Sequence, residues 1–122
     1  MSDCSDLIGL RYRLGADGAD GEIDCIHLVY TVLDRLQIAT PPFKPAWYDA
    51  SWRQVARDLL SWGYRIDSPA YDGDILLFRQ GLASFAVAWQ TGILYISPLT
   101  ERVNWCPVSS VTDYRCFRSR GS

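Results

Sequence analysis

The feature that most constrains this chain is an amphipathic segment that begins at Cys25. Apolar residues follow this cysteine at the i+3, i+4, i+7, i+8 and i+11 positions, namely Leu28, Val29, Val32, Leu33 and Leu36. That spacing places them in one stripe of a 3.6-residue helix. Asp24 is a good N-cap, because its carboxylate can accept hydrogen bonds from the free amides of the first turn. The pattern therefore predicts a helix over 25–36 with one buried face.

Cys25 has two interpretations at the start of this helix. The free amides of the first turn and the helix dipole favour a thiolate and are expected to lower the pKa of the thiol, as a nucleophile requires. Free cysteine is also among the most buried residue types and packs as a small hydrophobic side chain. Periodicity alone favours a core position, so the sequence keeps both interpretations open.

The rest of the chain predicts a second helix and then a sheet. Prolines at 41, 42 and 45 end the first helix, and Ser51 is the expected cap of a helix whose apolar face is formed by Trp52, Val55, Ala56, Leu59 and Leu60. After Gly63 the pattern changes to period two, and the strand candidates are 74–79, 84–90, 93–97, 102–106 and 113–117. Helices followed by an antiparallel meander predict the α+β class.

Length and composition exclude several functional classes. A chain of 122 residues predicts a single domain over 1–122. A net charge of −2 without a Lys/Arg run argues against a general nucleic-acid binder. No apolar stretch is long enough for a membrane span, and residues 1–6 lack the features of a signal peptide. One histidine and four cysteines without a CxxC pair predict thiols, no metal site and no cofactor.

Three segments carry a more specific signal. They read Gly9-Leu10-Arg11-Tyr12-Arg13-Leu14-Gly15-Ala16, Asp24-Cys25-Ile26-His27-Leu28-Val29 and Gly73-Asp74-Ile75-Leu76-Leu77-Phe78. In order and spacing they resemble the Gly-x-Pro-Tyr-x-x-Gly-Gly, Asp-Cys-Ser-Gly-Leu-Val and Gly-Asp-Leu-Val-Phe-Phe motifs of the NlpC family. These papain-like cysteine peptidases cut the peptide stems of peptidoglycan. The resemblance implies a papain-like NlpC fold, with N-terminal helices packed on an antiparallel β-sheet, and Cys25 as the nucleophile.

The chain departs from the family where the general base belongs. The next family strand begins His-Val-Gly-Ile, and that histidine is the base. Counted back from Gly92, its place falls on Ser84 or Phe85. Neither side chain can take a proton from a thiol near neutral pH. The third polar residue of the family site falls near Ile96 or Ser97, and neither is expected to orient an imidazole well.

The only histidine is badly placed to replace the base. Ile26 and His27 stand where the family has serine and glycine, and both would crowd the groove. Residues two apart on a helix point about 200° from one another. His27 should therefore share a face with Thr31 and Asp34, away from Cys25. It could serve Cys25 only through a frayed first turn or from a second protomer.

The resemblance and its departures together favour a degenerate domain, or pseudoenzyme. Such a domain would bind a cell-wall peptide or act as a structural protein subunit, as similar domains do in phage tails, and would be cytoplasmic or virion-associated. The expected groove residues are Tyr12, Asp24, His27, Trp47, Tyr48 and Trp89, although core packing explains the tryptophans equally well. One alternative is an active cysteine endopeptidase or amidase on peptidoglycan stem peptides with a relocated base. Another is a small interaction domain unrelated to peptidases.

Overall fold

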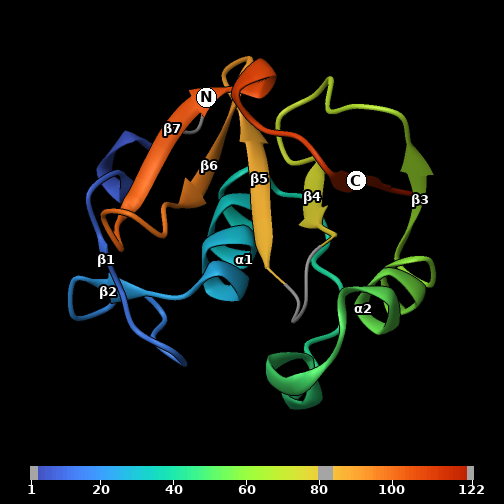
Figure 1. Cartoon of the computed structure of the whole chain (residues 1–122), viewed down its shortest axis with the longest axis horizontal. Helices are drawn as coiled ribbons and strands as arrows, with labels where there is room; N and C mark the ends of the chain where they lie inside the picture. Colours follow the sequence, from blue (N-terminus) through green and yellow to red (C-terminus); the bar gives the residue numbers. More distant parts are fainter. Residues whose placement is uncertain (1–2, 80–83, 121–122) are drawn as a thin grey trace.

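The protein places two helices against a six-stranded antiparallel sheet, in a computed structural model that describes residues 3–79 and 84–120 (Figure 1). The helices are α1 (Cys25–Arg35) and α2 (Trp52–Leu59). The sheet contains β3 (Gly63–Ile66), β4 (Ile75–Phe78), β5 (Phe85–Trp89), β6 (Gly92–Ile96), β7 (Val103–Pro107) and β8 (Tyr114–Ser119). Short 3-10 helices occur at η1 (Ser5–Leu7), η2 (Pro45–Asp49) and η3 (Val108–Ser110). The predicted α+β class is confirmed.

Helix α1 follows the apolar stripe of the sequence. The side chain of Asp24 caps it by accepting from the backbone N–H of His27. Its buried residues are Ile26, Leu28, Val29, Val32 and Leu33, and the helix lies against β5 on one face of the sheet (Figure 1). Leu36 forms the C-cap and packs against this core from a partly buried position. The predicted helix is therefore confirmed, and its first residue is Cys25.

Helix α2 has the predicted cap but a narrower apolar face. Ser51 and Gln54 form a capping box, in which each side chain bonds to the other residue's backbone N–H. Val55 and Leu59 are buried, whereas Leu60 is 46% exposed. Leu60 was predicted on the apolar face, but it is the C-cap residue beyond the last helical turn, so its place on that face was predicted wrongly.

The sheet is not the simple meander that the sequence predicted. Strands β4 to β7 are consecutive neighbours, but β8 returns across them and pairs with β4 on one side and β3 on the other. Strand β3 was not among the strand candidates, because Tyr64 and Arg65 are both exposed and the segment lacks a period-two pattern. Residues 9–24 also contain the short parallel strands β1 (Arg11–Tyr12) and β2 (Glu22–Ile23).

The sheet buries side chains on both faces. The larger cluster lies on the helix side and includes Phe85 and Val87 of β5 together with Leu94 of β6. Alternate residues face the other way, where Leu76, Ala86, Ile93 and Cys116 form a smaller cluster. Strand β5 is buried at every position, so its start is fixed relative to the N-terminal end of α1. This packing determines what can reach Cys25.

Candidate functional site

A pocket of about 350 Å³ opens beside Cys25. Its lining residues come from β1, the start of α1, the residue before β5, the end of β6 and the turn that follows β6: Tyr12, Cys25, Ser84, Ile96, Ser97, Pro98 and Glu101. The structure thus brings together Tyr12, Cys25 and Ser84, which were predicted from three separate segments as a groove residue, the nucleophile and the possible place of the family base. Pro98 and Glu101 were not among the selected residues, because they lie in a turn that carries no motif.

Backbone hydrogen bonds fix the wall of this pocket that faces Cys25. The N–H of Tyr12 donates to the carbonyl of Glu101 at 2.8 Å, which ties β1 to the turn between β6 and β7. Within that turn, the N–H of Glu101 donates to the carbonyl of Ser97 at 2.8 Å, and Glu101 adopts a positive φ of 54°. The Glu101 carboxylate is therefore carried on a tightly hydrogen-bonded turn at the pocket's edge.

The environment of the Cys25 sulfur opposes ionisation. Burial raises the pKa of the thiol to about 11, and the negative charge of Asp24 acts in the same direction. The backbone N–H of Phe85 and the amides of Cys25 and Ile26 lower this pKa, but they do not compensate for burial. The net pKa of the thiol is therefore raised, although the sequence led us to expect a lowered value at the helix start. The amides act as expected, and desolvation outweighs them.

Neither Ser84 nor Phe85 provides a base. Ser84 is exposed and lines the pocket, and its carbonyl accepts from the N–H of Phe78 at 2.9 Å. The ring of Phe85 instead packs on Trp47 at a centroid distance of 5.8 Å, inside the core. Only the backbone of Phe85 interacts with the sulfur of Cys25. Ser84 therefore offers the thiol a hydroxyl group, and Phe85 offers it a peptide N–H.

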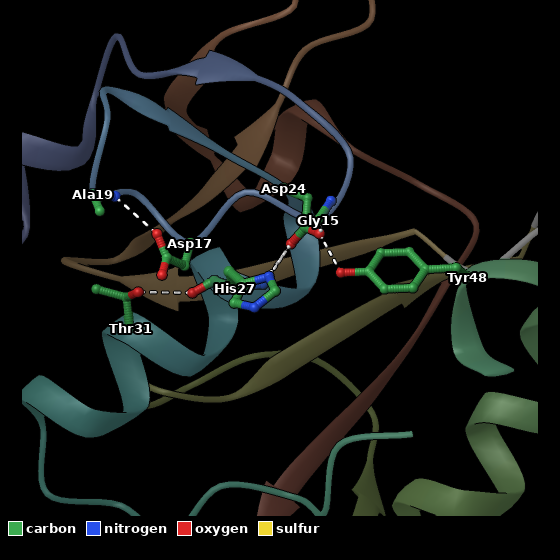
Figure 2. A network of polar contacts seen from close by, with 7 residues as sticks. All are labelled: Gly15, Asp17, Ala19, Asp24, His27, Thr31 and Tyr48. Carbon is green, nitrogen blue, oxygen red and sulfur yellow. Dashed lines mark hydrogen bonds and ion pairs between the residues drawn. The ribbon is translucent and has the colours of Figure 1, made fainter. Parts of the chain in front are cut away.

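Asp24 is the centre of a buried polar network (Figure 2). Its side chain is 1% exposed. Oδ1 accepts from the backbone N–H and from Nδ1 of His27, both at 2.8 Å. Oδ2 accepts from the N–H of Gly15 at 2.9 Å and from the hydroxyl of Tyr48. The carboxylate thus joins the 9–24 segment, the start of α1 and η2.

His27 faces this network and not the pocket. Its side chain is 30% exposed, its Nδ1 is bonded to Asp24, and its ring lies 6.1 Å from that of Phe43. Figure 2 shows the imidazole turned toward Asp24, with Thr31 one turn further along the helix. His27 does not line the Cys25 pocket. This agrees with the expectation that it points away from Cys25.

The expected groove aromatics occupy other places. Trp47 is 2% exposed and donates from Nε1 to Asp58 at 2.9 Å, and Trp89 is also buried in the helix-side core. Neither lines the Cys25 pocket, because both are fully used in packing. Tyr48 is half-buried, and burial together with its bond to Asp24 raises the pKa of its hydroxyl. Of the expected aromatic groove residues, Tyr12 is the one that reaches the pocket.

The part of the chain that the structure describes offers neither a cluster of metal-binding side chains nor a helix that could span a membrane. Over residues 3–79 and 84–120, no group of three or more His, Cys, Asp or Glu side chains could hold a metal ion. No helix in the same ranges has the length and apolarity to cross a membrane. The four cysteines are free thiols, with Cys4 and Cys116 buried.

Comparison with known proteins adds no relative to this picture. No family model matches the chain, and no curated protein matches its sequence significantly. The functional case therefore depends on the residues of the pocket themselves.

Proposed function

We propose that this chain is an NlpC-like domain that has lost catalysis and binds a peptide of the cell-wall type in the Cys25 pocket. The observation that carries the proposal is the state of the sulfur. Cys25 heads α1 and lines a pocket, as a nucleophile would, but the single histidine of the chain is bonded to Asp24 instead.

Nucleophilic attack requires a thiolate, and this site does not stabilise one. With a pKa of about 11, about one Cys25 sulfur in ten thousand is ionised at pH 7. Among the described residues, no cationic side chain lines the pocket to lower that pKa. Loss of one member of a catalytic triad costs several orders of magnitude in rate, so hydrolysis would be negligible.

The pocket retains groups that can bind a peptide. Ile96 and Pro98 offer apolar surface, Ser84 a hydroxyl, Tyr12 a ring and hydroxyl, and Glu101 a carboxylate. A carboxylate at the edge of an otherwise uncharged pocket favours a ligand with a free amino group. Peptidoglycan stem peptides combine such an amine with small apolar side chains. This match supports a stem peptide as the ligand.

Titration of the protein with a purified stem tetrapeptide, followed by calorimetry, tests the binding. We expect saturable binding that Glu101→Gln weakens several-fold, because the variant removes the charge that pairs with the amine. Asp20→Asn removes one exposed charge from the 9–24 segment outside the pocket and should leave the affinity unchanged. Absence of binding at millimolar peptide would overturn the proposal.

Chromatography of the same mixtures tests the loss of catalysis. The peptide should be recovered intact after prolonged incubation, and Cys25→Ala should bind it as well as the unmodified chain does. Cleavage that disappears in Cys25→Ala would instead establish the alternative, an active peptidase with a relocated base.

A further inference from the structure

Five arginines gather at the sheet edge that lies away from the Cys25 pocket. They come from α2, from β3, from the residue after β4 and from β8, and we call them the arginine cluster: Arg53, Arg57, Arg65, Arg79 and Arg115. Three of the guanidinium groups surround the ring of Trp52. Those of Arg53, Arg79 and Arg115 lie 5.1, 5.4 and 5.7 Å from its centroid. Tertiary packing thus concentrates positive charge on a chain whose net charge is −2.

This charge is poorly compensated within the protein. Among the described residues, Arg79 is the one member of the cluster with a carboxylate at ion-pair distance, Asp113 at 3.3 Å. The three guanidinium groups on Trp52 share one ring, so their like charges are held near one another. Burial and the neighbouring Arg65 and Arg79 also lower the pKa of Arg115. The surface is therefore prepared to accept negative charge.

A hollow of about 260 Å³ lies within the cluster. Four of its lining residues are the cationic side chains Arg53, Arg57, Arg65 and Arg115, and the other three are Ala56, Leu60 and Phe117. Phe117 is buried and forms part of the core, whereas Leu60 is exposed despite its size. The hollow thus combines an apolar surface with guanidinium groups around it. It could receive one aliphatic side chain flanked by anions.

We propose that the arginine cluster docks an acidic segment of a partner protein, with an aliphatic side chain of that segment in the hollow. Carboxylates match arginine well, because the planar guanidinium can hold both oxygens of one carboxylate at once. A leucine between acidic residues would cover Leu60 and Phe117 and would bring its neighbours to the surrounding arginines. The partner is therefore defined by an aliphatic residue with acidic residues on both sides.

A nucleic acid fits this surface less well. Single strands bind by stacking bases on aromatic rings along a charged groove. Here Trp52 is half-buried, and three guanidinium groups already lie around its ring. The hollow is also a single depression with an apolar lining, which suits one side chain better than a phosphate backbone. These features favour a protein segment.

The cluster is separate from the Cys25 pocket, so this inference does not rest on the proposed function. The two sets of lining residues have no member in common. The cluster is built on α2, β3 and β8, and the pocket on β1, the start of α1, and residues next to β5 and β6. Occupation of one site leaves the other open.

Fluorescence polarisation with a labelled Glu-Glu-Leu-Glu-Glu-Leu peptide tests the docking on the full chain in 150 mM salt. The double variant Arg53→Gln/Arg65→Gln should weaken binding at least tenfold. The control Arg11→Gln/Arg13→Gln removes the same charge from exposed positions on the 9–24 segment and should change affinity less than twofold. Replacing both leucines of the peptide by glycine should also weaken binding at least fivefold, because the hollow is then empty.

Three results would overturn the inference. Equal losses in the two double variants would mean that the peptide senses only the overall charge. Equal binding of the leucine and glycine peptides would exclude the hollow as a contact. Tighter binding of a single-stranded oligonucleotide of the same charge would identify a nucleic-acid surface. Circular dichroism and melting temperatures of all variants must match the unmodified chain, and Leu60→Asn provides a second change that leaves every arginine in place.

Discussion

Alkylation of Cys25 by iodoacetamide measures the thiolate population on which the proposed loss of catalysis depends. Burial raises the pKa of this thiol to about 11, compared with about 8.5 for an unperturbed cysteine. At pH 7.5 the thiolate population is then about 300-fold smaller than that of a free thiol. A more basic thiolate is a better nucleophile, and a Brønsted coefficient of about 0.45 returns about a tenfold gain. Cys25 should therefore react about 20-fold more slowly than the cysteine of an unstructured peptide with that ordinary pKa.

The assay follows alkylation between pH 6 and 9.5 by mass spectrometry of the peptide that contains Cys25, with an unstructured cysteine peptide in the same tube as the reference. The logarithm of the Cys25 rate should rise by about one for each pH unit over this whole range, because the range lies below the pKa. The reference should level off near its own pKa. Circular dichroism at each pH confirms that the chain remains folded.

A Cys25 rate that is independent of pH below 7, or faster than the reference at pH 6, would refute this reasoning. Either result would require a cation beside the sulfur, and the described residues of the pocket include none. A matched pair of variants at Ser84 tests the same reasoning by adding a base to the pocket. Ser84→His places an imidazole in the pocket and should raise the rate at pH 6.5 at least tenfold. Ser84→Asn adds similar bulk without charge and should not.

Further tests concern stability. Asp24→Asn places an amide NH₂ among the donors that now face a buried carboxylate, and we expect a loss of about 3 kcal/mol, or about 10 °C in Tm, against little change for the exposed Asp20→Asn. Burial raises the pKa of the Cys25 and Cys116 thiols to about 11 and about 12. In the unfolded chain both thiols ionise near pH 8.5, well below their pKa in the folded chain. The contribution of the two neutral thiols to the free energy of unfolding is therefore complete below about pH 8.5. It is lost as the pH rises toward the folded pKa values, at up to about 1.4 kcal/mol per pH unit for each thiol. The Tm should fall over that window, and less steeply in Cys116→Ala. Gly63→Ala would place its Cβ 2.1 Å from a carbonyl oxygen of β8, so urea denaturation should show a loss of at least about 2 kcal/mol.

The elements that the sequence predicted well are those whose signals are local. The cap and the apolar stripe of α1 lie within residues 24–36, and Ser51 with Gln54 marks α2 in the same way. The position of β8 between β3 and β4 has no such signal, because strand order depends on pairing between distant segments. Strand β3 escaped prediction for a related reason. It is an edge strand whose Tyr64 and Arg65 are both exposed.

The candidate site shows the same difference between local signals and features that depend on the folded chain. Motif order selected Tyr12, Cys25 and Ser84, and the structure brings these three residues to one pocket. The ionisation of Cys25 could not be predicted, because its sign depends on local amides and on burial that only the folded chain creates. The contact between Tyr48 and Asp24 likewise joins segments 24 residues apart that share no pattern.

The network around Asp24 changes what the Asp-Cys motif signifies in this protein. Its carboxylate accepts from two groups of His27, from Gly15 and from Tyr48, so every one of its contacts holds the fold together. Its charge meanwhile raises the pKa of the adjacent Cys25 and so works against a nucleophile. The motif is therefore sufficiently explained by structure, and its presence does not argue for catalysis. Because Asp24 anchors the segment that carries Tyr12, Asp24→Asn should weaken peptide binding along with stability, whereas Cys25→Ala should alter neither by much.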